Sequence, residues 1–171
     1  RIAYVHWGNE FIDRPYRDQI QFAHWMVDCG IDLVVGMHPH VLQGYEVYNE
    51  KHIFYSLGNF VFHMPWEPTK YAAIINVDLA HGNQITYDYV RIGTDYFPAY
   101  TDTVPWAYRF ETLNGRIPHD DENEVYYARL FVKMKSYRRA NSLHLVRNIF
   151  RFRLSDLLGI AGDFLKRRLK R

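Results

Sequence analysis

The chain has 171 residues, of which 48% are hydrophobic and 17% aromatic, and its formal net charge is only +2. This composition suffices for one folded domain with an appendage, and it excludes an intrinsically disordered chain. No apolar run reaches the roughly 18 residues of a transmembrane helix, and the single cysteine, Cys29, excludes an intramolecular disulfide bond.

The charge is distributed unevenly along the chain. Residues 138–171 contain ten Lys or Arg residues and two acidic ones, whereas residues 1–137 contain eleven basic and seventeen acidic residues. This pattern predicts a mildly acidic globule followed by a basic tail. An acidic globule does not favour nucleic acid as a partner. The chain opens on Arg1 with neither an initiator Met nor a signal peptide, so we expect it to be the middle of a longer protein.

The first part of the chain predicts a strand–helix–strand unit. Residues 2–7 are β-branched and aromatic, which favours a strand, and residues 31–35 form an apolar run that predicts a second, buried strand. Residues 16–29 predict a helix that ends before Gly30. The inward-facing stripe of this helix consists of Ile20, Ala23, His24 and Val27. A unit of this kind implies two parallel strands joined by a right-handed crossover.

The next segments predict antiparallel strands. Residues 45–48 and 52–57 flank a plausible turn and favour a hairpin. Residues 71–79 and 84–92 are two further strand candidates joined by a turn. We therefore expect an α/β fold in which the strand–helix–strand unit is followed by antiparallel sheet.

The rest of the chain is less regular. Residues 96–120, rich in proline and aromatic residues, predict an ordered but irregular connection between a domain at residues 1–95 and a helical extension at residues 121–171. From residue 142 the extension predicts a basic amphipathic stretch. Two interpretations remain open: this stretch docks on an anionic membrane surface or a synthase partner, or it packs on its own domain with a solvated basic face.

The most informative stretch is Gly36-Met37-His38-Pro39-His40, directly after the second predicted strand. Pro39 restricts the backbone on both sides and favours a stiff, bent tripeptide that carries two imidazoles. His6 ends the first strand. Because the carboxyl ends of parallel strands meet at one edge of a sheet, we expect all three imidazoles at a common rim. They are either metal ligands or histidines that hydrogen-bond to loop carbonyls.

Four segments occur together in order: Val5-His6-Trp7-Gly8-Asn9-Glu10, Pro15 with Gln19 at the start of the helix, residues 36–44, and Tyr55-Ser56-Leu57-Gly58-Asn59-Phe60-Val61-Phe62. This order resembles the C-terminal half of the CapA family, the poly-γ-glutamate capsule synthesis proteins. The resemblance covers about residues 1–95. The family's fold is similar to the calcineurin-like metallophosphoesterases, so the resemblance implies part of a metallophosphoesterase-like sandwich with a metal centre at the strand ends.

The resemblance also implies roles for individual residues. The implied metal ligands are His6, His38 and His40. Glu10 and His38 are the implied catalytic residues, with Glu10 as a general base or a group that orients water. Gln43 and Asn59 are the implied partners of the substrate or of the ligating imidazoles. The implied cofactor is a divalent ion, such as zinc, manganese or iron.

The chain departs from the family pattern at two places. Met37 separates Gly36 from His38, where metallophosphoesterases have Gly-His-x-His, and the family's carboxylate and amide ligands have no match here. We therefore expect this chain to be inactive by itself, although its full-length parent is a candidate hydrolase.

Two functions follow from the resemblance. The first is a metal-dependent hydrolase-type site, acting on an anionic polymer or a phosphoester in capsule or envelope polymer biosynthesis. The second is a non-catalytic envelope-assembly or polymer-binding subunit that docks to the membrane through the basic tail. Both imply an extracytoplasmic, membrane-associated location in the cell envelope.

Overall fold

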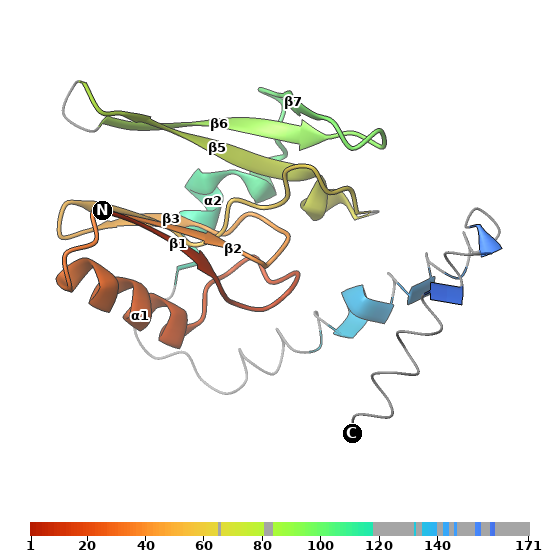
Figure 1. The fold of residues 1–171 in the computed structure, drawn as a ribbon, viewed down its shortest axis with the longest axis horizontal. Coiled ribbons are helices and arrows are strands. Elements are labelled where there is room, and N and C mark those ends of the chain that lie inside the picture. The colour runs from red at the N-terminus through yellow and green to blue at the C-terminus, as the bar shows by residue number, and fades with distance from the viewer. Residues whose placement is uncertain are drawn as a thin grey trace. The chain divides into compact units, whose positions relative to one another are not determined.

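The computed structural model describes residues 1–64, 66–80 and 84–117 and, beyond them, residues 132, 135–139, 142–143, 146, 153–154 and 158–159. The chain divides into two compact units, Arg1–Met134 and Lys135–Arg171. Within the second unit residues 135–139 are helical, whereas most of the predicted basic amphipathic stretch lies outside the described residues. Among the helices described, none combines the length and the apolar character needed to cross a membrane. The fold below is that of the first unit (Figure 1).

The first sheet has four strands in the order β1-β2-β4-β3. Strands β1 (Ile2–His6), β2 (Leu33–Met37) and β4 (Lys51–Phe54) run parallel, and β3 (Tyr45–Tyr48) pairs with β4 as an antiparallel hairpin. Helix α1 (Arg17–Asp28) connects β1 to β2. The predicted strand–helix–strand unit and the predicted hairpin are therefore confirmed.

The second sheet has three antiparallel strands in the order β5-β6-β7. A short 3-10 helix, η1 (Glu67–Lys70), leads into β5 (Tyr71–Asp78), which pairs along its whole length with β6 (Gln84–Ile92). Strand β7 (Pro98–Tyr100) adds to the other edge of β6. These two sheets give a mixed α/β fold, which agrees with the predicted class.

The segment predicted to be an irregular connection contributes to the fold instead. It contains β7, the 3-10 helix η2 (Trp106–Tyr108) and helix α2 (Phe110–Asn114). Phe110 is 0% exposed and belongs to the main core. Sequence periodicity does not reveal elements of three to five residues, because they are shorter than the windows over which a period is visible. Their order comes from packing rather than from propensity.

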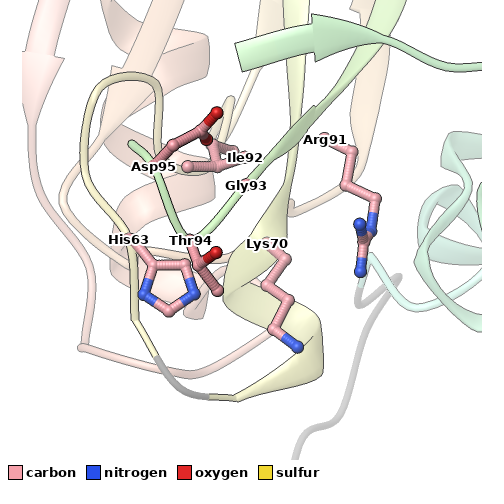
Figure 2. Close-up of a pocket in the computed structure, with 7 residues that line it drawn as sticks. All are labelled: His63, Lys70, Arg91, Ile92, Gly93, Thr94 and Asp95. Carbon is pink, nitrogen blue, oxygen red and sulfur yellow. The ribbon is translucent and has the colours of Figure 1, made fainter. Parts of the chain in front are cut away.

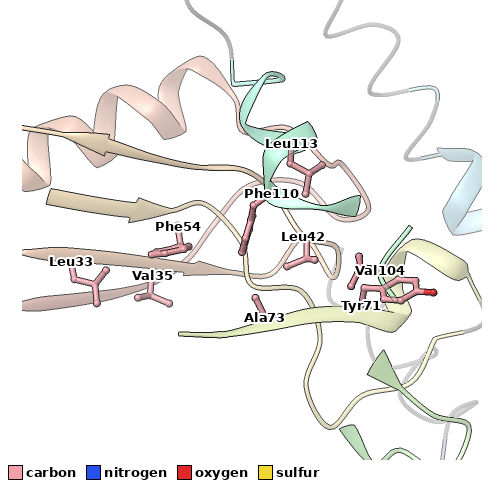
Figure 3. Close-up of a cluster of buried hydrophobic side chains, with 9 residues drawn as sticks. All are labelled: Leu33, Val35, Leu42, Phe54, Tyr71, Ala73, Val104, Phe110 and Leu113. Atoms are coloured by element: carbon pink, nitrogen blue, oxygen red, sulfur yellow. The ribbon is translucent and has the colours of Figure 1, made fainter. Parts of the chain in front are cut away.

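Two hydrophobic clusters lie on opposite faces of the first sheet, because side chains alternate along a strand. Leu33 and Val35 of β2 contribute to one cluster, and Val34 between them contributes to the other. The first cluster lies between the two sheets and α2 (Figure 3) and consists of Leu33, Val35, Leu42, Phe54, Tyr71, Ala73, Val104, Phe110 and Leu113. The second packs under α1 and consists of Ile20, Ala23, Met26, Val27, Val34, Ile53, Tyr55 and Ile117. The first sheet is thus covered on both faces, as a sheet with parallel strands requires.

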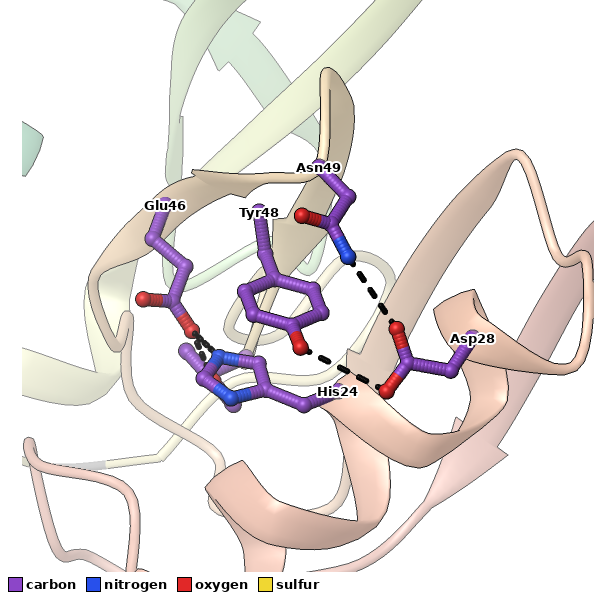
Figure 4. Close-up of polar contacts among 6 residues, drawn as sticks. His24, Asp28, Glu46, Tyr48 and Asn49 are labelled. Carbon is purple, nitrogen blue, oxygen red and sulfur yellow. Dashed lines mark hydrogen bonds and ion pairs between the residues drawn. The ribbon is translucent and has the colours of Figure 1, made fainter.

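Polar contacts tie α1 to the hairpin next to it (Figure 4). The His24 ring stacks on Tyr48 with a centroid distance of 3.8 Å, and His24 Nε2 lies 2.7 Å from Glu46 Oε1. Asp28 accepts hydrogen bonds from the Tyr48 hydroxyl (3.4 Å) and the Asn49 amide (3.1 Å). These contacts occupy His24 at a position well outside the rim, so it serves to attach the helix.

Candidate functional site

The rim is built where β1 and β2 end side by side. His6 pairs with Met37 in the parallel register, and the Trp7 amide donates to the Met37 carbonyl (3.1 Å). His38 therefore follows immediately beside His6, and their ring centroids are 4.3 Å apart. The His38 and His40 rings are 6.0 Å apart. The three imidazoles thus lie at one edge of the first sheet.

The loop after β2 owes its bend to unusual backbone angles. His38 has φ 103° and His40 has φ 60°, a region that residues other than glycine rarely occupy. Phe11, in the loop after β1, has φ 66°, and its amide donates to the Pro39 carbonyl at 2.7 Å. Such conformations cost about 1–3 kcal/mol each and persist only where the surrounding contacts hold them. The two loops therefore hold each other in shape around the imidazoles.

The orientation of His40 follows from its contact with Asn59. Asn59 is 5% exposed, and its Nδ2 donates to the Thr69 carbonyl (3.0 Å), which can only accept. Its Oδ1 therefore faces His40, where Nδ1 lies 2.8 Å away. Because Oδ1 is an acceptor, the proton sits on Nδ1 and the lone pair of Nε2 is available to a ligand.

Aromatic rings surround His40. Phe11 stacks on it at a centroid distance of 5.9 Å. Phe62, which lies in the segment after β4, has its ring centroid 5.4 Å from that of His40. Trp66 packs edge-on against Phe11 at 4.7 Å. Phe11 belongs to none of the sequence motifs, although an apolar pair, Phe11-Ile12, inside a polar loop is a signal that it is buried. These rings give His40 an aromatic surrounding on the side of Phe11 and Phe62.

Gln43 supports the loop after β1. Its side chain is fully buried, its Nε2 donates to the carbonyls of Ile12 (2.9 Å) and Arg14 (3.1 Å), and its Oε1 accepts from Gln19 Nε2 (3.2 Å). These bonds go to the loop and to α1, whereas the sequence predicted a contact with the substrate or an imidazole. A buried loop needs partners for its carbonyls, and Gln43 supplies them.

Glu10 lies in the loop after β1, with intermediate exposure, and so belongs to the same edge of the sheet as the histidines. Within the described ranges, no group of three or more His, Cys, Asp or Glu side chains is arranged to hold a metal ion. The imidazoles have the chemistry of ligands for zinc or a similar ion. Their present arrangement falls short of a complete coordination site.

Comparison with known proteins gives this rim a family context. Residues 1–64 match the sequence profile of a family described as bacterial capsule synthesis protein PGA_cap. The chain is 44% identical over 91 residues to the capsule biosynthesis protein CapA of Bacillus anthracis. It is 50% identical over 78 residues to the PGA biosynthesis protein CapA of Bacillus subtilis (strain 168). Residues 1–64 are therefore similar to a segment of the CapA proteins.

The matched residues include the three imidazoles of the rim and Asn59. The two Bacillus alignments cover 53% and 46% of the chain. A third relative, a probable polyglutamine synthesis accessory protein of Mycobacterium tuberculosis, is 35% identical over 60 residues, which is 35% of the chain and 16% of that protein. The chain spans only about a fifth of the two CapA proteins, 22% and 20% of their lengths.

Proposed function

We propose that this chain is part of a protein that takes part in poly-γ-glutamate capsule synthesis in the bacterial cell envelope. The observation that carries this proposal is that the CapA similarity coincides with the rim. The family match ends at residue 64, and all three imidazoles fall within it, as does Asn59, the partner of His40. Similarity confined to the core strands would instead have supported the fold alone.

Within that function, the rim is a candidate metal-dependent hydrolase-type site. His6, His38 and His40 are the residues that would hold a divalent ion such as zinc, manganese or iron. An ion held by imidazoles supplies an acidified water and polarises a phosphoryl or carbonyl oxygen. The candidate substrates are the anionic polymer and a phosphoester.

The residues of this chain have distinct tasks in that proposal. Asn59 keeps the Nε2 lone pair of His40 available, and Phe11 stacks on the same ring. Glu10 is the candidate general base, since it is a carboxylate of the loop after β1, four residues after His6. His38 stands against His6 and is the imidazole proposed to contact the substrate.

A second candidate function is a non-catalytic assembly subunit. It is favoured by the incomplete arrangement of metal ligands among the described residues. The basic residues of 142–171 would then attach the protein to an anionic membrane surface or to a synthase partner. In this case the rim would bind the polymer without hydrolysing it.

The test uses a poly-γ-glutamate-producing Bacillus strain that lacks its own CapA. The complete protein containing this chain is introduced either unchanged, with His38→Ala and His40→Ala together, or with the control His24→Gln. Polymer released by the cells and metal bound to the purified proteins are measured.

The hydrolase proposal expects the unchanged protein and the control to restore polymer and the double variant to lose both polymer and metal. Polymer retained by the double variant would favour the assembly subunit, and no restoration by the unchanged protein would refute a role in this synthesis.

A further inference from the structure

A second polar site lies at the second sheet. A pocket of about 300 Å³ is lined by His63, Lys70, Arg91, Ile92, Gly93, Thr94 and Asp95 (Figure 2). These residues come from the loop before η1, the end of η1, the end of β6 and the turn that follows β6. The volume is at the lower end of the range for small-ligand pockets, so it suits a short group and not a long polymer.

The charged groups of this pocket have both signs. Lys70 and Arg91 contribute two cations, and Asp95 contributes one carboxylate. Lys70 Nζ donates to Glu67 Oε2 at 2.8 Å, and Glu67 Oε1 accepts from the Tyr71 hydroxyl at 3.0 Å. The hydrogen bond from Lys70 lowers the pKa of Glu67, which therefore stays ionised. Glu67 does not line the pocket, so its charge offsets the cations from outside.

The carboxylate of Asp95 is held in place. Its Oδ1 accepts from the Phe97 amide at 3.2 Å, and the Gly93 amide donates to the Phe97 carbonyl at 3.2 Å, which closes the turn. A Cβ at Gly93 would approach Asp95 Oδ1 to 2.4 Å. Glycine at position 93 is therefore what allows Asp95 to lie against the turn, beside the pocket.

Lys70 keeps its ion pair with Glu67, which lies outside the lining. The lining groups themselves, two cations and one carboxylate, are complementary to a ligand with two carboxylates and one ammonium group. In a γ-linked glutamate chain each peptide bond uses a side-chain carboxyl, so every residue keeps a free α-carboxylate. The residue at the amino end also keeps a free α-ammonium group. The last two residues at that end therefore have the complementary set of charges, which a residue in the middle of the polymer lacks.

We propose that this pocket binds the amino end of a γ-linked glutamate chain, with Lys70 and Arg91 on the α-carboxylates and Asp95 on the terminal ammonium group. Arg91 forms paired hydrogen bonds with one carboxylate and Lys70 acts on the other as a point charge. The inference rests on the proposed function for the identity of the polymer. It adds that the protein recognises a chain end, which the rim does not explain.

The test is calorimetric titration of the purified chain with a γ-linked glutamate trimer, compared with the same trimer acetylated at its amino end. Arg91→Gln and Lys70→Gln each remove one cation. Lys51→Gln is the matched control, because Lys51 is also a lysine in an ion pair with a carboxylate, 3.0 Å from Asp32, but in the other sheet. Asp95→Asn removes the charge and keeps an oxygen for the Phe97 amide. Thermal unfolding of each variant checks that it is folded.

The proposal expects acetylation, Arg91→Gln and Lys70→Gln each to weaken binding about tenfold, the size of one charge-assisted contact, with Lys51→Gln unchanged. Asp95→Asn should bind free and acetylated trimers equally, a result that a purely structural role would not produce. Equal binding of both trimers by the unchanged chain would overturn the proposal. So would absence of binding, an equal loss in Lys51→Gln, or inorganic phosphate binding as tightly as the trimer.

This result is independent of the cell experiment. If the complete protein restores polymer in the Bacillus strain but the trimer does not bind, the inference fails and the proposed function stands. If the trimer binds as expected but polymer is not restored, the proposed function fails and the pocket remains a chain-end site.

Discussion

Single residues decide how the rim is built. His40 is oriented by Asn59, Asn59 is oriented by the Thr69 carbonyl, and Thr69 is itself buried. This chain of contacts joins the loop after β2 to the segment before β5. The direction of one imidazole at the first sheet is thus set by a residue that leads into the second.

Asn59→Ala should lower the free energy of unfolding by about 1–3 kcal/mol, because His40 Nδ1 and the Thr69 carbonyl each lose a partner. The measurement is urea unfolding followed by circular dichroism. The matched control is Asn76→Ala, which removes an exposed amide that donates to Asp88 at 2.7 Å. We expect the control to change stability by less than about 0.5 kcal/mol. Equal effects of the two substitutions would show that the contact with His40 is not stabilising.

Gly36 is the other residue on which the rim depends. It is the next-to-last residue of β2, before Met37 and the histidine loop, and a Cβ there would approach the Tyr55 carbonyl oxygen to 2.1 Å and Trp7 Nε1 to 2.3 Å. Trp7 Nε1 donates to that same carbonyl at 2.9 Å. Glycine thus leaves the space in which Trp7, directly after β1, donates to Tyr55, directly after β4.

Gly36→Ala should destabilise the protein by about 3 kcal/mol, the upper range for overpacking, because backbone and indole both must move. Gly115→Ala is the control. Its nearest neighbouring atom lies at 3.6 Å and its φ is −65°, so alanine fits without strain and should be neutral or slightly stabilising. Thermal unfolding of the two variants makes the comparison. A similar melting temperature for both would contradict the close approach at Gly36.

At the scale of elements, the hairpin of β3 and β4 contains a histidine that is poorly suited to protonation. The His52 ring stacks between Tyr45 (6.3 Å) and Phe54 (6.2 Å), and its buried Nδ1 has no hydrogen-bond partner among the described residues. Burial lowers the pKa of His52 below 6.5. The unfolded chain therefore binds the proton more readily than the folded one.

This difference gives the stability a pH dependence of known sign. The contribution of neutral His52 to the free energy of unfolding is fully present above about pH 6.5. It decreases as the pH falls from there towards the lower pKa of folded His52, because protonation favours the unfolded chain. His52→Phe should remove this part of the acid sensitivity. Urea unfolding of both proteins at pH 8 and at pH 5 measures the change in the free energy of unfolding between the two pH values. The proposal is contradicted if the stability difference between the two pH values is the same in both proteins.

At the scale of the whole molecule, the uneven charge suggests how the protein meets a surface. The basic residues closest to the C-terminal end are Lys166, Arg167, Arg168, Lys170 and Arg171, all outside the described residues. Changing these five to glutamine should weaken binding to vesicles containing phosphatidylserine by up to about 1 kcal/mol for each charge. Co-sedimentation with vesicles at low and high salt is the measurement. Binding that is unchanged, or equal on neutral phosphatidylcholine vesicles, would exclude electrostatic docking of the tail.

The sequence by itself determined the elements whose pattern is local. Apolar periodicity located α1, β5 and β6 within a residue or two. The parallel strand–helix–strand unit predicted that β1 and β2 end at the same edge of the sheet, and that His6 and His38 therefore lie there. The family resemblance could also be recognised from the sequence, because its motifs are short and occur in order along the chain.

Only the tertiary structure decided what depends on residues far apart in the chain. The bond of His40 to Asn59 spans 19 positions, and the bonds of Gln43 to the loop at Ile12 and Arg14 span 31 and 29. The burial of α2 and the pocket at Arg91 likewise arise where separate segments meet. The direction of a polar side chain is set by the partners that packing brings within about 3 Å, and a pattern of neighbours along the sequence does not contain those partners.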